Sequence, residues 1–474
     1  MIFDSGHFAT RKIKHVHFVG IGGSGMGGIA EVMVNLGYQV HGSDIQESEM
    51  TRRLAKLGAT ISPKHDVSNV SNADVVVMSS AVGDDNPEII AARDRRIPVV
   101  PRAEMLAELM RFRYGIAVAG THGKTTTTSL IASILANSGF DPTFIIGGRV
   151  NSFGSHSKLG TGQYLVAEAD ESDSSFLYLQ PIMSVVTNID SDHLDAYGGD
   201  FKALQDAFLQ FIHHLPFYGI AVLCIDDQNV AFLLPKIARP YTTYGFSDGA
   251  DYRVIEVTKS QNQTEFVLAR PDKQPPLRFT LNLLGTHNVL NAVAAVVIAL
   301  QLDVKEDCIQ SALEHFQGIS RRLEIYPQIC ISDKHVQLLD DYAHHPVEIA
   351  ATMSTVRDNW PGKRLVVLFQ PHRYTRTRDL FDDFVRVLNE VDVLMLCEVY
   401  AANEDPIAGA DSLSLSRALR ARGKLDPILV KDYAEIEATL RHVVNEGDIL
   451  LTLGAGSIGN FARQLNDTFS ASRN

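Results

Sequence analysis

The sequence predicts an α/β protein of three domains: a Rossmann-like N-terminal domain, a central domain with a parallel or mixed sheet of the P-loop ATPase type, and a Rossmann-like C-terminal domain. Short apolar strands alternate with helical segments, which is typical of parallel sheets with crossover helices. Glycine-rich turns at 20–25 and 120–123 each join a predicted strand to a predicted helix. The 474 residues also exceed what one hydrophobic core ordinarily organises, so about three domains are expected.

The first predicted domain covers residues 1–113. Its strands are "HVHFVG" (15–20), "YQVHGSD" (38–44) and the buried "ADVVVMSSAV" (73–82), with a helix after Gly25. The turn "GIGGSG" (20–25) fits Gly-x-Gly-x-x-Gly, and Asp44 closes the next strand, where a ribose-binding acid belongs in a dinucleotide fold. This pattern alone favours a dehydrogenase. However, any nucleoside diphosphate can place its pyrophosphate at such a helix start, and a tight turn without a ligand is a further alternative.

The second predicted domain covers residues 114–321. Its strands are "YGIAVAG" (114–120), "QYLVAEAD" (163–170) and "IMSVVTNID" (182–190), and longer alternating segments near 251–285 predict an antiparallel edge of the sheet. Residues 125–139 and 287–300 are predicted to form helices, the second one mostly buried.

The stretch "GTHGKTTTT" (120–128) predicts a nucleotide triphosphate site, although its glycines bracket two residues instead of four. Backbone N–H groups from Thr121 to Lys124 can cradle phosphate oxygens, Lys124 can reach the terminal phosphates, and the Thr125 hydroxyl can bind Mg²⁺. Two acidic clusters, 168–173 and 190–195, follow buried strands, where open α/β sheets place their ligands. Chemistry alone ranks His193 low there, because Mg²⁺ prefers oxygen.

The third predicted domain covers residues 322–474. Its strands are "VQLLDD" (336–341), "RLVVLFQ" (364–370), "VDVLMLCEV" (391–399), "PILV" (427–430) and "DILLTLGAG" (448–456). A second glycine match, "GAGSIG" (454–459), lies too close to the chain end for another strand and acid. We therefore expect it to be a close packing turn between strand and helix.

Composition limits the class of partner and the compartment. The formal net charge of −13 leaves no excess of Lys and Arg to neutralise a phosphate backbone, so we expect no nucleic-acid binding. The four cysteines lie far apart, which disfavours a disulfide framework or a thiolate zinc site and indicates a reducing compartment. No signal peptide is recognisable, and no stretch approaches the ~18 apolar residues of a membrane span. We therefore expect a cytoplasmic protein without membrane insertion.

The ordered set of motifs resembles the Mur ligases of bacterial cell-wall synthesis over almost the whole chain. The motifs are "GIGGSGM", "GTHGKTTTT", "EADESD", "NIDSDHLD", "GTHNVLNA", "GISRRLE", "DDYAHHP" and "HRYTRTRDL". The resemblance implies an ATP-dependent ligase that joins L-alanine to UDP-N-acetylmuramate through an acyl phosphate, with Mg²⁺ or Mn²⁺. The short glycine loop is the family's own version of an ATP site.

The resemblance also implies roles for particular residues. The candidate catalytic residues are Lys124, Arg322 and His344, and no residue is assigned as the base that takes the amine proton. The candidate ATP-binding residues are Gly120, Thr121, His122, Gly123, Lys124, Thr125, Thr126, His287, Asn288, Asn291, Arg322 and Asp341. The candidate metal ligands are Thr125, Glu168 and His193. For the sugar nucleotide the candidates are Gly22, Ser24, Gly25, Met26, Asp44, His65 and Ser79, and for the amino acid they are Tyr342, His344, His372, Arg373 and Arg376.

Several of these residues also have a purely structural interpretation. Asn288 and Asn291 could be a helix cap and an interior hydrogen bonder. Arg321 could be a solvated neighbour of Arg322, and one ring of the pair His344–His345 could lie at the surface. If a helix begins by Arg373, the spacing to Arg376 brings both guanidinium groups towards one face, where they suit one free α-carboxylate.

Three competing functions each account for part of the sequence. A nicotinamide-dependent dehydrogenase leaves the Gly-Lys-Thr loop without a role, and a nucleotide switch or motor leaves the first-domain diphosphate site unexplained. A sister ligase that attaches a recycled murein peptide to the same sugar nucleotide is the nearest alternative.

Overall fold

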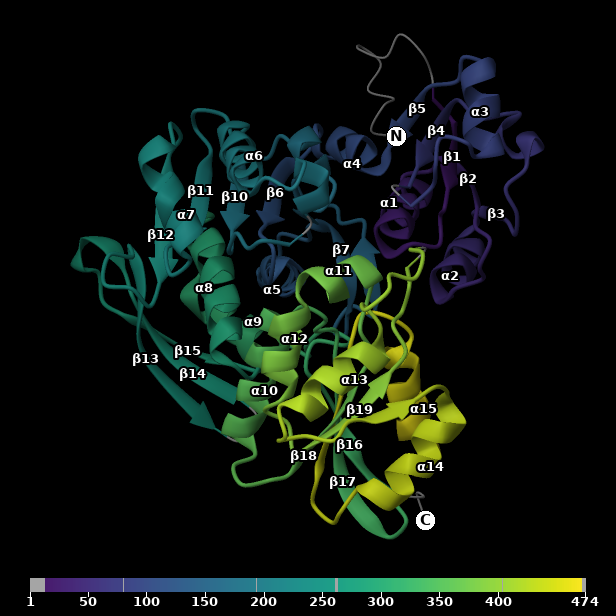
Figure 1. Cartoon of the computed structure of the whole chain (residues 1–474). Helices are drawn as coiled ribbons and strands as arrows, with labels where there is room; N and C mark the ends of the chain where they lie inside the picture. Colours follow the sequence, from purple (N-terminus) through teal and green to yellow (C-terminus); the bar gives the residue numbers. More distant parts are fainter. Residues whose placement is uncertain (1–12, 80, 193, 261–262, 403, 471–474) are drawn as a thin grey trace. The chain divides into compact units, whose positions relative to one another are not determined.

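The computed structural model describes residues 13–79, 81–192, 194–260, 263–402 and 404–470, which form three separate α/β sheets (Figure 1). The first two sheets lie in one compact unit, residues 1–282 and 287–317, and the third lies in a second unit, residues 283–286 and 318–474. This architecture confirms the predicted α/β class with parallel and mixed sheets.

The first sheet is parallel throughout and has the strand order β3-β2-β1-β4-β5. The strands are β1 (His15–Val19), β2 (Gln39–Ser43), β3 (Thr60–Ser62), β4 (Val75–Met78) and β5 (Val99–Pro101). The helices are α1 (Ser24–Asn35), α2 (Glu49–Leu57), α3 (Pro87–Asp94) and α4 (Arg102–Met110), with the 3₁₀ turn η2 (Val67–Val70). The three predicted strands are confirmed, and the two additional strands, β3 and β5, have only three residues each.

The central sheet has ten strands in the order β15-β14-β13-β12-β11-β10-β6-β9-β7-β8. They are β6 (Tyr114–Ala119), β7 (Thr143–Val150), β8 (Ser155–Lys158), β9 (Tyr164–Glu168), β10 (Met183–Val186), β11 (Ile220–Cys224), β12 (Tyr241–Gly245), β13 (Tyr252–Ser260), β14 (Gln263–Ala269) and β15 (Leu277–Leu281). The expected antiparallel edge is confirmed at β13–β15, and β8 adds a second antiparallel edge that was not predicted.

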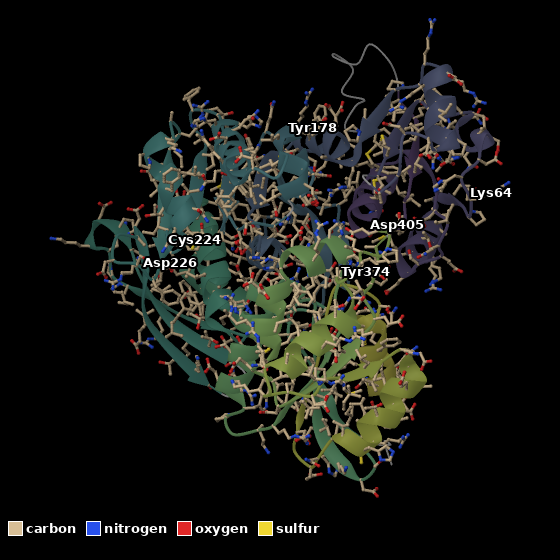
Figure 2. The ribbon with its side chains drawn as sticks, viewed as in Figure 1. Lys64, Tyr178, Cys224, Asp226, Tyr374 and Asp405 are labelled. Carbon is tan, nitrogen blue, oxygen red and sulfur yellow. The ribbon has the colours of Figure 1, made fainter. Side chains whose placement is uncertain are left out.

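Five helices accompany the central sheet: α5 (Lys124–Asn137), α6 (Phe201–His213), α7 (Gln228–Leu233), α8 (Thr286–Gln301) and α9 (Glu306–Glu314). Short 3₁₀ turns add η3 (Ser175–Tyr178), η4 (Leu194–Tyr197), η5 (Leu234–Lys236) and η6 (Pro271–Lys273). Cys224, labelled in Figure 2, is buried at the end of β11, and all four cysteines are free, as their spacing predicts. Within the described residues, no helix is both long and apolar enough to cross a membrane.

The third sheet has the order β16-β17-β21-β18-β19-β20 and is parallel except for β16, which pairs antiparallel with β17. Its strands are β16 (Glu324–Ile331), β17 (Lys334–Asp341), β18 (Leu365–Phe369), β19 (Val393–Cys397), β20 (Ile428–Val430) and β21 (Ile449–Leu453). Its helices are α10 (Pro346–Asn359), α11 (Tyr374–Asp379), α12 (Phe381–Leu388), α13 (Ser412–Ala421), α14 (Tyr433–Val443) and α15 (Ile458–Phe469).

Burial on both faces explains the apolar runs of this third sheet. Alternate residues of β18 enter two different hydrophobic clusters, one on each face of the sheet. A strand covered on both faces reads as a continuous apolar run rather than an alternating one. The five predicted strands are confirmed for that reason, whereas β16 was not predicted.

Candidate functional site

The Gly-Lys-Thr loop connects β6 to α5 and is anchored on the end of the neighbouring strand β10. The backbone N–H of Thr121 donates to the carbonyl of Asn188 (3.1 Å), and the N–H of His122 donates to the Asn188 side chain (2.8 Å). The Thr187 hydroxyl donates to the carbonyl of His122 (2.6 Å). Because β10 lies directly beside β6, these bonds hold the loop at the carboxyl edge of the sheet, where α/β proteins bind ligands.

Both glycines of the loop are required by close packing and by backbone conformation. A Cβ atom on Gly120 (φ +132°) would lie 2.0 Å from the Thr187 hydroxyl oxygen, and one on Gly123 (φ +84°) would lie 2.5 Å from Oδ1 of Asn291. Gly123 is also the N-cap of α5, and no side-chain bond caps this helix. With glycine at this position, no side chain of the cap residue covers the start of α5, and a helix start favours phosphate.

Lys124 begins α5 and is enclosed by oxygen atoms. Its Nζ donates to the carbonyl of Gly120 (2.7 Å) and pairs with both carboxylate oxygens of Glu171 (2.7 and 3.0 Å). Burial acts to lower the pKa of Lys124, but Glu171 and Asp170 outweigh it, so the pKa is raised and the ammonium stays charged. Burial raises the pKa of Glu171 despite the charge of Lys124. The sequence placed Glu171 only in an acidic cluster and did not assign this pairing.

The predicted metal ligands are only partly described by the structure. Thr125 is buried in the first turn of α5, and Glu168 closes β9, the other neighbour of β6. Oε1 of Glu168 accepts the N–H of Gly147 (2.7 Å), which orients the carboxylate. His193 lies outside the described residues. The two described residues supply a hydroxyl and a carboxylate, which are oxygen ligands suited to Mg²⁺.

Two asparagines of α8 lie close to the phosphate loop and to the helix that follows it. Asn288 and Asn291 are both 7% exposed, and the amide of Asn291 donates to the side chain of Asn288 (3.1 Å). Oδ1 of Asn291 accepts the hydroxyl of Thr127 (3.2 Å), which ties α8 to α5. Asn288 lies inside α8, two residues after its first residue, so it is not the helix cap. His287, next to it, is exposed.

The first-domain glycine turn is organised by the acid at the end of the next strand. Oδ2 of Asp44 accepts the N–H of Gly22 (2.8 Å), and a Cβ atom on Gly22 would lie 2.7 Å from that oxygen. A Cβ atom on Gly20 would lie 3.1 Å from the Cβ of Ser79. The turn leads into α1, whose N-cap Gly23 has no side chain, and Ser24, Gly25 and Met26 form its first turn. Asp44, Ser79 and the turn are therefore brought together.

His65 belongs to a buried network around Glu88, a residue that the sequence did not single out. Oε2 of Glu88 lies 2.9 Å from Nδ1 of His65 and accepts the hydroxyl of Ser43 (2.5 Å). Burial acts to raise the pKa of Glu88, but contacts from His17, Ser43 and Asn69 lower it to about 2. In the sequence, Glu88 resembles any acidic residue in the first turn of a helix, here α3. Its special environment comes from partners that lie far away along the chain.

In the second unit, four predicted residues form one aromatic cluster. The His344 ring lies edge-on to Tyr342 (centroids 5.3 Å apart) and to His372 (5.7 Å). Nδ1 of His344 lies 3.0 Å from the Tyr342 carbonyl oxygen, and the Arg322 guanidinium lies 5.0 Å from the centre of the Tyr342 ring. His372 stacks on Tyr400 (5.4 Å), which the sequence did not predict.

Arg321 is not a solvated neighbour of Arg322, contrary to the expectation. Its Nε donates to Oδ2 of the buried Asp340 (3.2 Å), and its guanidinium also donates to the carbonyls of Gly454 and Gly456. A Cβ atom on Gly459 would lie 2.2 Å from Nε of Arg321. The turn "GAGSIG" therefore has the expected packing role: Arg321 lies against Gly459, and Gln370 lies against Gly454 and Gly456.

His345 does not lie at the surface either. It is 4% exposed and is the N-cap of α10, where Nδ1 accepts the N–H of Val347 (3.4 Å) and Glu348 completes a capping box. Its neighbour His344 is partly exposed. The buried ring thus has a structural role, and His344 remains the candidate for chemistry.

The expected helical spacing of Arg373 and Arg376 is wrong. Helix α11 begins at Tyr374, and Arg373 is its N-cap with φ +70° and ψ +137°, outside the helical region. Arg376 is 7% exposed, and its Nη1 lies 3.4 Å from Nδ1 of His372, whereas Arg373 is exposed. The hydrogen bond from the N–H of Arg373 to the carbonyl of Tyr400 (2.9 Å) holds the chain out of the helix at this position. Of these two arginines, only Arg376 contacts the aromatic cluster, through His372.

Asp341 closes β17 and is buried. Its carboxylate accepts the N–H groups of Leu323 (2.6 Å) and Ala343 (2.7 Å). Burial raises the pKa of Asp341 to about 6, although the charge of Arg322 and both backbone donors oppose this shift. Asp341 and Arg322 thus lie within electrostatic reach of each other.

Comparison with known protein families identifies three consecutive matches. Residues 15–114 match the Mur ligase family catalytic domain, residues 118–299 match the Mur ligase middle domain, and residues 321–456 match the Mur ligase glutamate ligase domain. Together these matches cover most of the chain, in the order in which the three sheets follow one another.

Individual relatives agree with the family matches. The UDP-N-acetylmuramate–L-alanine ligase of Methylococcus capsulatus is 58% identical over 455 residues, which are 96% of each chain. The solved structure of the UDP-N-acetylmuramate–alanine ligase of Thermotoga maritima is 30% identical, with a TM-score of 0.83 over 98% of this chain and 100% of that one. A murein peptide ligase of Psychrobacter arcticus is 24% identical with a TM-score of 0.71 over 96% and 98%, which shows a shared fold.

Proposed function

The chain belongs to the Mur ligase family, and we propose that it joins L-alanine to the carboxylate of UDP-N-acetylmuramate, with conversion of ATP to ADP and phosphate. The observation that carries this proposal is the 58% identity to a UDP-N-acetylmuramate–L-alanine ligase along 96% of both chains. The reaction is a step of peptidoglycan precursor synthesis, and we place it in the cytoplasm. We assign residues 1–113 to the sugar nucleotide, 114–321 to ATP and 322–474 to the amino acid.

The activation step follows from the chemistry of the substrates. A carboxylate is a poor electrophile because it is an anion, and transfer of the γ-phosphoryl group converts it into an acyl phosphate with a good leaving group. Lys124 and Arg322 would stabilise the negative charge on the transferring phosphoryl oxygens, which is the dominant contribution in such transfers. The raised pKa of Lys124 supports this role, because the ammonium is charged before ATP binds.

The phosphate loop and α8 would hold the nucleotide. The loop residues from Gly120 to Thr126 would surround the phosphates, and His287, Asn288 and Asn291 would face the adenine. Asp341 would accept hydrogen bonds from the ribose. Thr125, Glu168 and His193 would hold Mg²⁺ or Mn²⁺, which would supply further positive charge beside the phosphates.

The amino-acid site would be the aromatic cluster of the second unit. Arg376 would bind the α-carboxylate of L-alanine, because a guanidinium fork matches a carboxylate. Tyr342, His344 and His372 would surround the rest of the molecule, and Arg373 would contribute from the exposed rim. The neutral amine then attacks the acyl phosphate, and phosphate leaves. Closure of the sites during this step would exclude water, which otherwise hydrolyses the acyl phosphate.

The decisive test measures ADP release with ATP alone, with each further substrate and with both. We expect little release with ATP alone and rapid release only when UDP-N-acetylmuramate and L-alanine are both present. Vigorous release that neither substrate affects would favour the nucleotide switch or motor. Replacement of L-alanine by a murein tripeptide tests the sister ligase, and faster turnover with the peptide would overturn the proposal.

A further inference from the structure

Arg102, the first residue of α4, lies against the first turn of α1. A Cβ atom on Gly25 would lie 2.8 Å from Nη1 of Arg102 and 3.5 Å from its Cζ. The glycine at position 25 therefore makes room for a guanidinium group. The side chain is 21% exposed, so the charge is largely enclosed.

A positive charge at this position is unfavourable unless an anion lies beside it. The start of a helix carries partial positive charge, and the amides of the first turn of α1 have no capping side chain at Gly23. A cation and a helix start placed together repel each other, whereas an anion between them is attracted by both. The arrangement thus favours a ligand with negative charge.

The structure provides one carboxylate on the other side of Arg102. Nη2 of Arg102 lies 3.4 Å from Oδ2 of Asp170, which belongs to the acidic cluster after β9. The 3.4 Å separation marks a weak hydrogen bond, so Asp170 orients the guanidinium without using all of its donors. Nη1 remains directed at the first turn of α1.

The backbone that carries Arg102 is held firmly. The α4 side chains Met105, Leu106 and Leu109 are buried in the hydrophobic cluster that they share with Phe176 of η3. Tyr178, labelled in Figure 2, ends η3, and this turn packs against α4. Arg102 is therefore presented from a rigid support rather than from a mobile loop.

We propose that Arg102 binds the diphosphate of the sugar nucleotide together with the first amides of α1, and that Asp170 is its positioning residue. This inference rests on the proposed function, since it names a further residue of the same site. Nη1, the nitrogen that faces Gly25, would donate to the phosphate oxygens in charge-assisted hydrogen bonds.

Isothermal titration calorimetry on the full-length protein without ATP tests the inference. The ligands are UDP-N-acetylmuramate, UDP and UMP. Arg102→Ala should weaken binding of UDP-N-acetylmuramate and UDP by about tenfold or more, and that of UMP less. Arg102→Lys should retain part of the affinity because it keeps the charge. The KM values for ATP and L-alanine should stay within about twofold, since Arg102 would contact neither.

Arg149→Ala is the matched control. Arg149 pairs with Glu49 (3.1 Å), so this variant removes another Arg–carboxylate pair between the first domain and the central sheet and leaves Arg102 and Asp170 in place. It should bind all three ligands normally. Asp170→Asn should weaken UDP-N-acetylmuramate binding in the unmutated background and add little to Arg102→Ala, which a double-mutant cycle measures.

The outcomes separate the inference from the function. Normal affinity of Arg102→Ala for UDP-N-acetylmuramate, or an equal loss for all three ligands, would overturn the role of Arg102 alone. Failure of the unmutated protein to bind UDP-N-acetylmuramate would overturn the proposed function and the inference together.

Discussion

Nζ of Lys124, the first residue of α5, lies 2.7 Å from Oε2 of Glu171, which follows β9. Glu171 is 1% exposed, so the partner of the Lys124 ammonium is a buried carboxyl group. A lysine held in this way is charged and oriented before its substrate arrives, and such preorganisation is a large source of electrostatic stabilisation in catalysis.

Replacement of this lysine should therefore impair phosphoryl transfer more than binding. We expect Lys124→Ala to lower kcat by at least ~100-fold, comparable to the loss of one preorganised donor. Lys158→Ala is the matched control, because Lys158 also forms a 2.7 Å ion pair, with Asp141, but at an exposed position. Steady-state ADP release measures both variants, and near-normal turnover by folded Lys124→Ala would remove this loop from the mechanism.

A methyl group at the N-cap of α5 should deform the nucleotide loop. Gly123→Ala would bring Cβ to 2.5 Å from Oδ1 of Asn291, and we expect the KM for ATP to rise about tenfold or more. Gly139→Ala is the control for backbone strain, because Gly139 has a similar φ of +80° but no atom near its Cβ position. That control should lose roughly 1–2 kcal/mol of stability and leave the KM for ATP unchanged. Equal KM values in the two variants would contradict the packing argument.

The buried carboxyl of Asp341 should make stability depend on pH. The folded protein keeps this proton up to about pH 6, whereas the unfolded chain releases it near the ordinary value of 3.8. Between these values the folded state binds more protons, so its stability falls as pH rises, by about 3 kcal/mol in total. The thermal midpoint of the unmutated protein relative to Asp341→Asn should therefore decrease from pH 4.5 to pH 6 and stay level above it. A difference that rises or stays constant over this range would refute the assignment.

The two arginines near α11 should contribute unequally to alanine binding. Arg376→Ala should raise the KM for L-alanine by about tenfold or more, because Arg376 is buried beside His372. Arg373→Ala should have a smaller effect, since Arg373 is exposed and precedes the helix. Alaninamide, which lacks the anion, should be a poor substrate of the unmutated protein. If both variants act equally, or if alaninamide reacts as well as alanine, Arg376 is not the carboxylate anchor.

The sequence predicted the elements whose pattern is local. The runs "LVVLF" of β18 and "ILLTL" of β21 are apolar because the sheet is covered on both faces. Each run therefore predicts a buried strand from its own residues alone. By contrast, β16 is an edge strand with Pro327 in its interior, and such a segment resembles a loop.

The site residues divide in the same way. Lys124 and Asp44 are predicted as site residues from spacing along the chain, whereas the environment of Arg321 depends on the carbonyl of Gly454, 133 residues later. The N-cap position of Arg373 depends on pairing with Tyr400. Partners brought together only by the tertiary fold leave no periodic signal in one sequence, so these features required the structure.

The position of β21 has a consequence for synthesis of the chain. This strand is the last of the third sheet to leave the ribosome, yet it lies between β17 and β18 and pairs with both. Until residues 449–453 arrive, β17 and β18 each present an unpaired apolar edge, and such edges are prone to aggregation. Nascent chains that stall before this strand should therefore depend on chaperones, while the first two sheets, whose strands have all been made, can already fold.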